Sequence, residues 1–136
     1  MEETGESGAK MTSYNAEFDI AIAVDVSFAN AKGEDKNKCG EMGKGAMIGI
    51  SPTLSKEISK ALIKSAEKNN IPYQTEVMSG ETGTDADAIG VSRSGVMTAT
   101  VSVPIKYMHT PVEVVSVSDI ENSARLIAEF LKDGAI

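Results

Sequence analysis

The apolar residues of this chain fall into short dense runs that alternate with stretches of helical period. Three segments are rich in aliphatic and β-branched residues, which is typical of strands in a layered sheet: residues 19–29, 46–51 and 96–105. The segment 71–79 predicts a fourth strand. Because the first segment is apolar almost throughout, we expect both of its faces to be covered. In the last segment Val101 and Val103 alternate with Thr100 and Ser102, which is the period of a pleated strand.

Helical spacing predicts three helices between and after these strands. Residues 54–68 form an amphipathic helix with Thr53 or Ser51 as its N-cap. A glycine-rich loop precedes a short helix over residues 86–93. The last helix begins at a capping box of Ser118 and Glu121 and ends near Gly134; its predicted apolar face consists of Ile120, Ala124, Ile127 and Leu131.

The alternation of strands and helices predicts an α/β fold in which helices cover both faces of one sheet, a three-layer αβα arrangement. Residues 30–45 are polar, contain four glycines and predict a long loop within it. We expect a single domain over residues 1–136, since a chain of this length is the size of one ordinary domain. The order of the strands does not follow from the pattern.

Composition then narrows the classes of partner. Twenty acidic and 13 basic residues give a net charge of -7, and no basic cluster interleaved with aromatic residues is present. Nucleic acids and anionic membranes would be repelled, so we expect neither as a partner. Cys39 is the single cysteine, no apolar run approaches the roughly 20 residues of a membrane span, and no signal peptide is recognisable. We therefore expect a cytoplasmic protein.

His109 is the single histidine, so carboxylates would have to supply the rest of any catalytic or metal site. Asp25 is the sharpest candidate, because a carboxylate inside an apolar strand needs a cation or strong donors. The alternative is that the strand ends at Val24 and Asp25 begins a loop. His109 itself could equally be a structural residue held by local hydrogen bonds.

Other acidic residues are weaker candidates. Of the adjacent Glu2 and Glu3, one could bind a metal while the other holds and deprotonates a water. Acidic pairs of this kind are, however, usually solvated. Thr84 and Asp85 could build a site, or simply cap the helix that follows. Glu113 could orient the imidazole of His109. Walker-type phosphate loops, Gly-x-Ser-x-Gly elbows and Cys/His zinc frameworks do not occur. A metal held by carboxylates and His109 is the most economical chemistry.

Six motifs in a fixed order carry a resemblance over nearly the whole chain: EETGESGAK, AIAVDV, MGKG, IPYQTEV, TGTDADAI and SVPIKYMHTPVEVV. Together they resemble the C-terminal part of the catalytic domain of the glutamyl or deblocking aminopeptidases. These are the tetrahedral, cocatalytic metallopeptidases, some of which carry an endoglucanase label. The resemblance implies a partial zinc-peptidase domain, two divalent metal ions, zinc or cobalt, and hydrolysis of N-terminal residues from peptides.

The same resemblance implies roles for individual residues. Glu2 corresponds to the general base and Glu3 to a metal ligand, while Asp25 and His109 correspond to ligands of different ions. Thr84 and Asp85 correspond to a turn that supports the substrate pocket. A further histidine ligand, a bridging aspartate and a β-rich dimerisation insert lie upstream in the family and are expected to be missing from these residues.

Three interpretations of function remain open. The chain is expected to be an aminopeptidase fragment that is inactive alone and either self-associates or needs an upstream segment. The alternative is a non-enzymatic α/β binding or assembly module that keeps the fold without the site. A glycosidase is the third, but aromatic platforms for sugar stacking are lacking.

Overall fold

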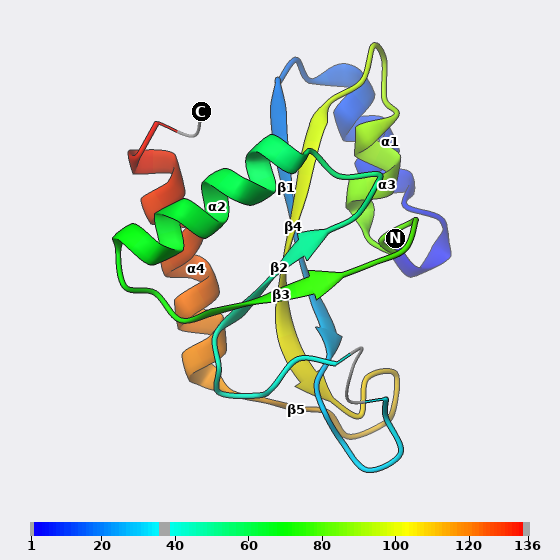
Figure 1. The fold of residues 1–136 in the computed structure, drawn as a ribbon. Coiled ribbons are helices and arrows are strands. Elements are labelled where there is room, and N and C mark those ends of the chain that lie inside the picture. Colours follow the sequence, from blue (N-terminus) through cyan, green and yellow to red (C-terminus); the bar gives the residue numbers. More distant parts are fainter. Residues whose placement is uncertain (1, 36–38, 135–136) are drawn as a thin grey trace.

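The computed structural model describes residues 2–35 and 39–134, which form one sheet between two layers of helices (Figure 1). The strand order is β1 (Ile20–Phe28), β4 (Met97–Lys106), β2 (Ala46–Ile50) and β3 (Tyr73–Val77), and the short strand β5 (Val114–Val115) also pairs with β4. β1 is parallel to β4, β2 is parallel to β3, and β4 is antiparallel to β2 and β5. The predicted three-layer α/β fold is confirmed.

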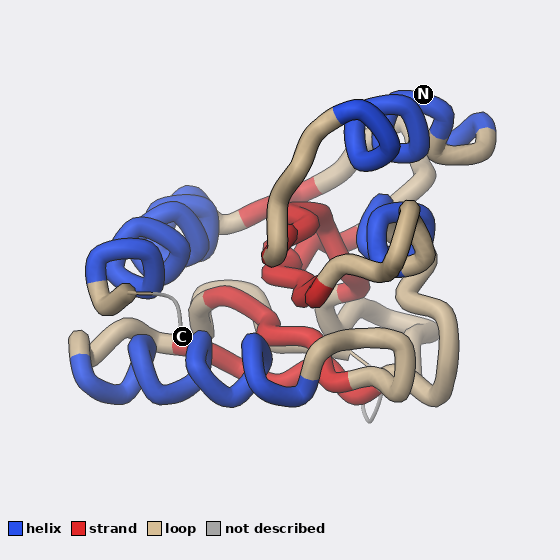
Figure 2. Tube along the Cα trace, turned by 90° about the horizontal axis from the view of Figure 1, so that it is seen from above, coloured by secondary structure: helices blue, strands red, loops and turns tan. Residues whose placement is uncertain are grey.

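Two pairs of helices lie on opposite sides of this sheet (Figure 2). The long helices α2 (Lys56–Lys68) and α4 (Val117–Lys132) cover one face, and α3 (Asp85–Gly90) covers the other with α1 (Ser7–Asn15) packed against it. The one-turn helix η1 (Glu2–Thr4) and α1 were not predicted, because their residues lack a clear apolar stripe. Within residues 2–35 and 39–134, none of the helices is long and apolar enough to cross a membrane.

The apolar core lies between the sheet and the two long helices. Its buried side chains come from the central strands and the inner faces of α2 and α4: Ala46, Ile48, Ile58, Leu62, Ala99, Val101, Leu126 and Phe130. Apolar area removed from water contributes about 25 cal/mol per Å², so this layer supplies much of the stability.

β1 differs from its prediction in one respect. The strand forms where expected, but it lies at one edge of the sheet and pairs only with β4 among the described strands. Val24 is 59% exposed and Phe28 43% exposed, so the expectation that both faces are covered is wrong for this half of the strand. Ile20 and Ile22, at its beginning, do pack against the core.

α4 forms as predicted but presents a different face. Its buried residues are Asp119, Ser123, Leu126 and Phe130. Of the predicted face, Ile127 packs partly buried against the core, whereas Ile120, Ala124 and Leu131 are exposed. The capping box is also wrong, because the helix begins at Val117 and places Ser118 inside the first turn. Ser118 exchanges a hydrogen bond of 2.8 Å with Ser116 instead.

The N-cap of α2 is Ser55 rather than Thr53 or Ser51. The Ser55 hydroxyl accepts a hydrogen bond from the N–H of Ile58. Ser51 and Thr53 donate hydrogen bonds to the carbonyl of Gly80 and so tie the start of the 80–84 loop to the end of β2. The short helix α3 ends at Gly90, three residues before the predicted end.

Asp119 is a carboxylate on the core side of α4, and backbone hydrogen bonds compensate for its burial. The residue is fully buried, and its two oxygens accept hydrogen bonds from the N–H groups of Gly43 (2.6 Å) and Gly45 (2.8 Å). Gly45 has a φ of +92° and approaches the backbone of Pro72 so closely that a Cβ would overlap it. Asp119 therefore fixes the loop that leads into β2.

Replacing Asp119 by alanine should lower the free energy of unfolding by about 2 kcal/mol, because the buried N–H of Gly45 and the partly buried N–H of Gly43 would lose their acceptor. Urea denaturation followed by circular dichroism measures this change. Glu121→Ala, an exposed acidic residue on the same helix, is the matched control and should change stability by less than about 0.5 kcal/mol. Equal stabilities of the two variants would contradict the assigned role of Asp119.

Candidate active site

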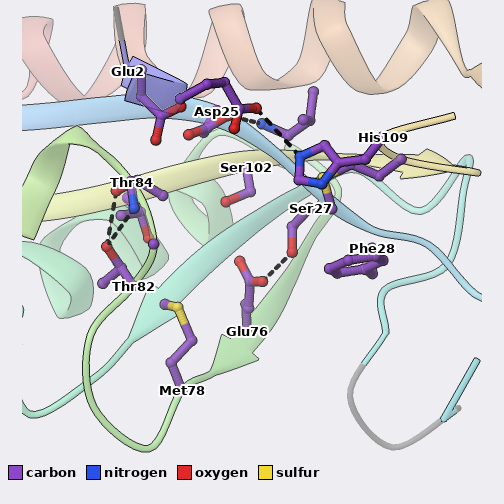
Figure 3. Close-up of a pocket in the computed structure, with 15 residues that line it drawn as sticks. Glu2, Asp25, Ser27, Phe28, Glu76, Met78, Thr82, Thr84, Ser102 and His109 are labelled. Carbon is purple, nitrogen blue, oxygen red and sulfur yellow. Dashed lines mark hydrogen bonds and ion pairs between the residues drawn. The ribbon is translucent and has the colours of Figure 1, made fainter. Parts of the chain in front are cut away.

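A cavity of about 290 Å³ lies on the side of the sheet that faces away from α2 and α4, at the ends of β1 and β3 (Figure 3). Its lining comes from segments distant in sequence: η1, β1, β3, β4, the 82–84 loop and the turn after β4. Glu2, Glu3, Asp25, Thr84 and His109, all predicted from the sequence, line it together. Its volume is at the lower end of the range for small-molecule sites.

The imidazole of His109 lies beside the carboxylate of Glu3. Its Nε2 is 3.3 Å from Glu3 Oε1, and both side chains are largely exposed. The backbone of His109 is left-handed, with a φ of 62°, which is uncommon for a residue other than glycine. Glu113 accepts a hydrogen bond from the backbone N–H of His109 (2.8 Å), so it holds the turn rather than the imidazole ring.

Asp25 lies inside β1, which continues to Phe28, so the interpretation of Asp25 as the start of a loop is wrong. The residue is half-buried and is paired in register with Ser102 of β4, which puts both side chains on the cavity face. Its Oδ1 accepts a hydrogen bond of 2.7 Å from the N–H of Val26. Asp25 thus presents a carboxylate to the cavity from the sheet itself.

Glu2 stands at the mouth of the cavity, next to Glu3 in the one-turn helix. Partial burial and the nearby carboxylates of Glu3, Asp25 and Asp85 raise the pKa of Glu2 above its ordinary value. A carboxyl group whose pKa is raised in this way is better suited to exchange protons near neutral pH.

Thr84 and Asp85 have different places. The hydroxyl of Thr84 caps α3 by accepting a hydrogen bond from the N–H of Ala86 (3.2 Å), and it also lines the cavity. Asp85 faces a neighbouring hollow that it shares with Glu2. Asp87, which the sequence did not single out, accepts hydrogen bonds from the N–H groups of Thr82 and Gly83 and so shapes the loop.

The floor of the cavity is a polar face of the sheet that sequence reasoning missed. Ser27 of β1, Glu76 of β3 and Thr100 and Ser102 of β4 all line it. The Ser27 hydroxyl donates a hydrogen bond to Glu76 Oε1 (Figure 3). The available signal was the alternation of Thr100 and Ser102 with the valines of β4, which indicates a polar face of the strand. The sequence did not indicate that both hydroxyl residues are buried.

The described residues do not form a complete metal site. Zinc in proteins takes three or four protein ligands. Within residues 2–35 and 39–134, no three His, Cys, Asp or Glu side chains are grouped so that they could hold one ion. Glu3 and His109 are a pair, and Asp25 approaches the cavity from a different element. The donor set fits part of a metal centre and not a whole one.

Gly49 of β2 leaves room for the polar side chains of this floor. It is paired with Glu76 of β3, and a Cβ built on it would lie 1.9 Å from the Thr100 hydroxyl oxygen. Such an overlap cannot be accommodated without moving the side chain or the strand. The absence of a side chain at this position therefore permits the arrangement of Glu76 and Thr100 on either side of it.

Comparison with known proteins gives consistent matches. A family model described as M42 glutamyl aminopeptidase matches residues 1–126. The lysyl aminopeptidase of Pyrococcus furiosus is 34% identical over 132 residues, which make up 97% of this chain and 38% of that protein.

Solved structures agree with these sequence matches. An aminopeptidase from the archaeon Desulfurococcus kamchatkensis has a TM-score of 0.88 and 36% identity, covering 96% of this chain and 38% of that chain. The TET1 peptidase of Pyrococcus horikoshii, which can assemble into a tetrahedron or a large octahedral shell, has a TM-score of 0.73 and 31% identity, covering 95% of this chain and 38% of that one. The chain thus spans well under half the length of these relatives.

Substituting Gly49 by alanine should lower the free energy of unfolding by about 1–3 kcal/mol, because the new methyl group overlaps the Thr100 hydroxyl. Adding Thr100→Ala should recover part of the loss, which a double-mutant cycle of denaturation midpoints measures. Gly80→Ala is the control, since a Cβ there meets nothing within 4 Å. Additive effects of the two substitutions would contradict a direct overlap.

Proposed function

The chain belongs to the M42 glutamyl aminopeptidase family, and we propose that it supplies part of the active site of an enzyme that removes N-terminal residues from peptides. The observation that carries this proposal is the convergence of Glu2, Glu3, Asp25 and His109 on one cavity. Glu2 and Glu3 lie in η1, Asp25 lies in β1 and His109 lies in the turn after β4, so the fold brings distant segments together at this cavity.

In the proposed enzyme Glu2 is the general base, and Glu3, Asp25 and His109 are metal ligands. The raised pKa of Glu2 and its position at the cavity mouth support a role in accepting a proton from the attacking water. Two divalent ions, zinc or cobalt, are proposed as the cofactors of the complete enzyme. Thr84 and Asp85 are proposed to support the substrate loop, since Thr84 caps α3 at the cavity edge.

The proposed enzyme needs ligands beyond these described residues. Glu3 and His109 give one ion two ligands, and Asp25 gives a second ion one. A site that lacks one or more ligands binds its metal weakly, because each donor adds to the affinity. The relatives contain more than twice the length matched here, which leaves room for the missing donors. We therefore propose that residues 1–136 alone do not hydrolyse peptides.

A non-enzymatic binding or assembly module is the second candidate. The lack of any group of three metal-binding side chains within the described residues favours it over a self-sufficient enzyme. The two candidates differ in what happens when the missing ligands are supplied. An enzyme part regains activity, whereas an assembly module does not.

The test is hydrolysis of aminoacyl p-nitroanilides by the purified chain in zinc or cobalt, with and without a second polypeptide. That polypeptide is the part of the Pyrococcus furiosus lysyl aminopeptidase that this chain does not match. We expect no hydrolysis by the chain alone and measurable hydrolysis by the mixture. Glu2→Gln should abolish the restored activity, because the amide cannot accept the proton.

Two results would contradict the proposal. Metal-stimulated hydrolysis by the chain alone would show that the described ligands suffice. Restored activity that survives Glu2→Gln would remove the role of Glu2. Complex formation without any hydrolysis, detected by light scattering, would favour the assembly module instead.

We also propose that the edge of β1 is an interface, either with a further segment of the enzyme or with a second copy of the chain. Val24, Val26 and Phe28 expose apolar side chains along this edge. An edge strand of nine residues also offers unpaired backbone groups to another strand. The assembly of the Pyrococcus horikoshii TET1 peptidase into shells is consistent with self-association.

Light scattering of the purified chain should therefore report a species larger than a monomer. Val24→Lys should shift the chain toward the monomer, because a lysine on an edge strand opposes pairing. Val91→Lys, at the exposed C-cap of α3 and outside the sheet, is the matched control. A monomer at all concentrations, or an equal shift in both variants, would contradict self-association through this edge and leave only the interface with a further segment of the enzyme.

A further inference from the structure

We infer that a pocket between α2 and the ends of β2 and β3 binds an aliphatic carboxylate, an anion with a hydrocarbon body and one carboxylate head. The pocket has a volume of about 410 Å³, within the range of about 300–1,000 Å³ for small-molecule sites. It lies beside α2 (Figure 1) and shares Met78 with the candidate active site. The inference goes beyond the proposed function and does not depend on it.

The walls of the pocket call for an apolar body. Ile63 of α2, Ile50 of β2 and Val77 of β3 supply aliphatic side chains to them. Ile50 is 40% exposed and Val77 is 77% exposed, so much of this surface is in contact with water. Covering it with a hydrocarbon chain is favourable, because apolar area on both the ligand and the protein is then removed from water.

The hydroxyl groups beside these walls are already engaged. Ser59 donates a hydrogen bond of 2.8 Å to the carbonyl of Gly49, and Ser51 donates one to the carbonyl of Gly80. Neither hydroxyl proton is therefore available to a ligand. The amide groups of a peptide pressed against these walls would lose water without gaining a side-chain donor, which is costly. A hydrocarbon body fits the pocket better than a peptide does.

The rim of the pocket carries positive charge. Lys56 and Lys60 line it from successive turns of α2, and neither Asp nor Glu is among the described lining residues. Neither ammonium forms an ion pair with a described residue, whereas Lys68 and Lys132 of the two long helices do. In a chain with a net charge of -7, this rim is a local reversal of sign. A carboxylate head group is complementary to it.

The place of Lys56 in its helix agrees with an anion at this rim. Lys56 is the first residue of α2, where the positive end of the helix dipole disfavours a cation. Glu57, the acidic residue of the first turn, is not among the residues that line the pocket. A carboxylate bound beside Lys56 would offset the charge of the side chain and the helix dipole together.

Octanoate and octylammonium test the inference, because they share an eight-carbon chain and differ in the sign of the head group. Each is titrated into the purified chain below its micellar concentration by calorimetry, and methyl ¹H–¹³C NMR locates the site. The net charge of -7 favours the cation over the surface as a whole, so a preference for the anion must arise locally. We expect octanoate to bind about fivefold more tightly or better, with methyl shifts at Ile50, Ile63 and Val77.

Three variants assign the effect to the pocket. Lys60→Met keeps the apolar stem, removes the charge and should weaken octanoate binding about threefold. Lys64→Met, at an exposed position of the same helix outside the pocket lining, is the matched control and should leave the affinity unchanged. Val77→Glu adds a carboxylate to the exposed wall and should abolish octanoate binding. All three positions are exposed, so the unfolding temperature should stay close to the wild-type value.

Four results would overturn the inference: equal binding of the two probes, equal losses in Lys60→Met and Lys64→Met, octanoate binding that survives Val77→Glu, and methyl shifts at the β1 edge instead of the pocket. N-acetyl-leucyl-leucine carries the same carboxylate on a short peptide. Tighter binding of this peptide than of octanoate would identify a peptide end as the occupant and would also overturn it. Because every readout is an affinity, the outcome is separate from that of the hydrolysis experiment.

Discussion

The pleat of β4 is the constraint on which the rest of the molecule depends. Its residues from Thr98 to Ile105 are buried on both faces, with aliphatic side chains on one face and three hydroxyl residues followed by Pro104 on the other. Burial of the aliphatic face is favourable by itself, so two amphipathic helices are enough to cover it. Burial of the hydroxyl face is favourable only where partners are supplied. The two faces therefore need different coverings, and the second one becomes the cavity.

The cavity brings together several carboxylates that repel one another. Four carboxylates and a single imidazole line it, and the turn that carries His109 has left-handed backbone at Tyr107 and His109. Such conformations are costly for residues other than glycine, and they persist where surrounding contacts hold them. Here the carboxylate of Glu113 and the hydroxyl of Thr110 hold the turn through backbone groups. Stability is provided by the apolar side of the sheet, and the polar side is left free for binding.

The sequence predicted those strands and helices in which one hydrophobic period dominates. It failed where the buried face of an element had to be distinguished from its exposed face. The four main strands and the helices α2 and α4 follow from local pattern, and Thr84 was correctly identified as a possible cap. The inner face of α4 was misassigned because Asp119 and Ser123 are polar yet buried. The partners of Asp119 lie far away in sequence, and Ser123 is satisfied within the helix by donating to the carbonyl of Asp119, so the hydrophobic pattern did not indicate the burial of either residue.

The candidate site was likewise predicted only in part from the sequence. Glu2, Glu3, Asp25 and His109 were singled out by residue type and by resemblance, and the fold places them around one cavity. Ser27 and Glu76 were missed, since a serine and a glutamate in strands are unremarkable until the register is known.

The hydrogen bonds of Asp119 have a consequence for the way the chain folds. One side chain near the C-terminus holds two amide groups that precede β2, so the third strand in the sheet order depends on the last helix. Contacts with such sequence separation carry a large loop-closure entropy and slow the search for the native state. A ribosome must therefore release nearly the whole segment before the start of β2 is fixed. Until β2 is in place, Gly49 does not lie between Glu76 and Thr100, and the polar floor of the cavity is incomplete.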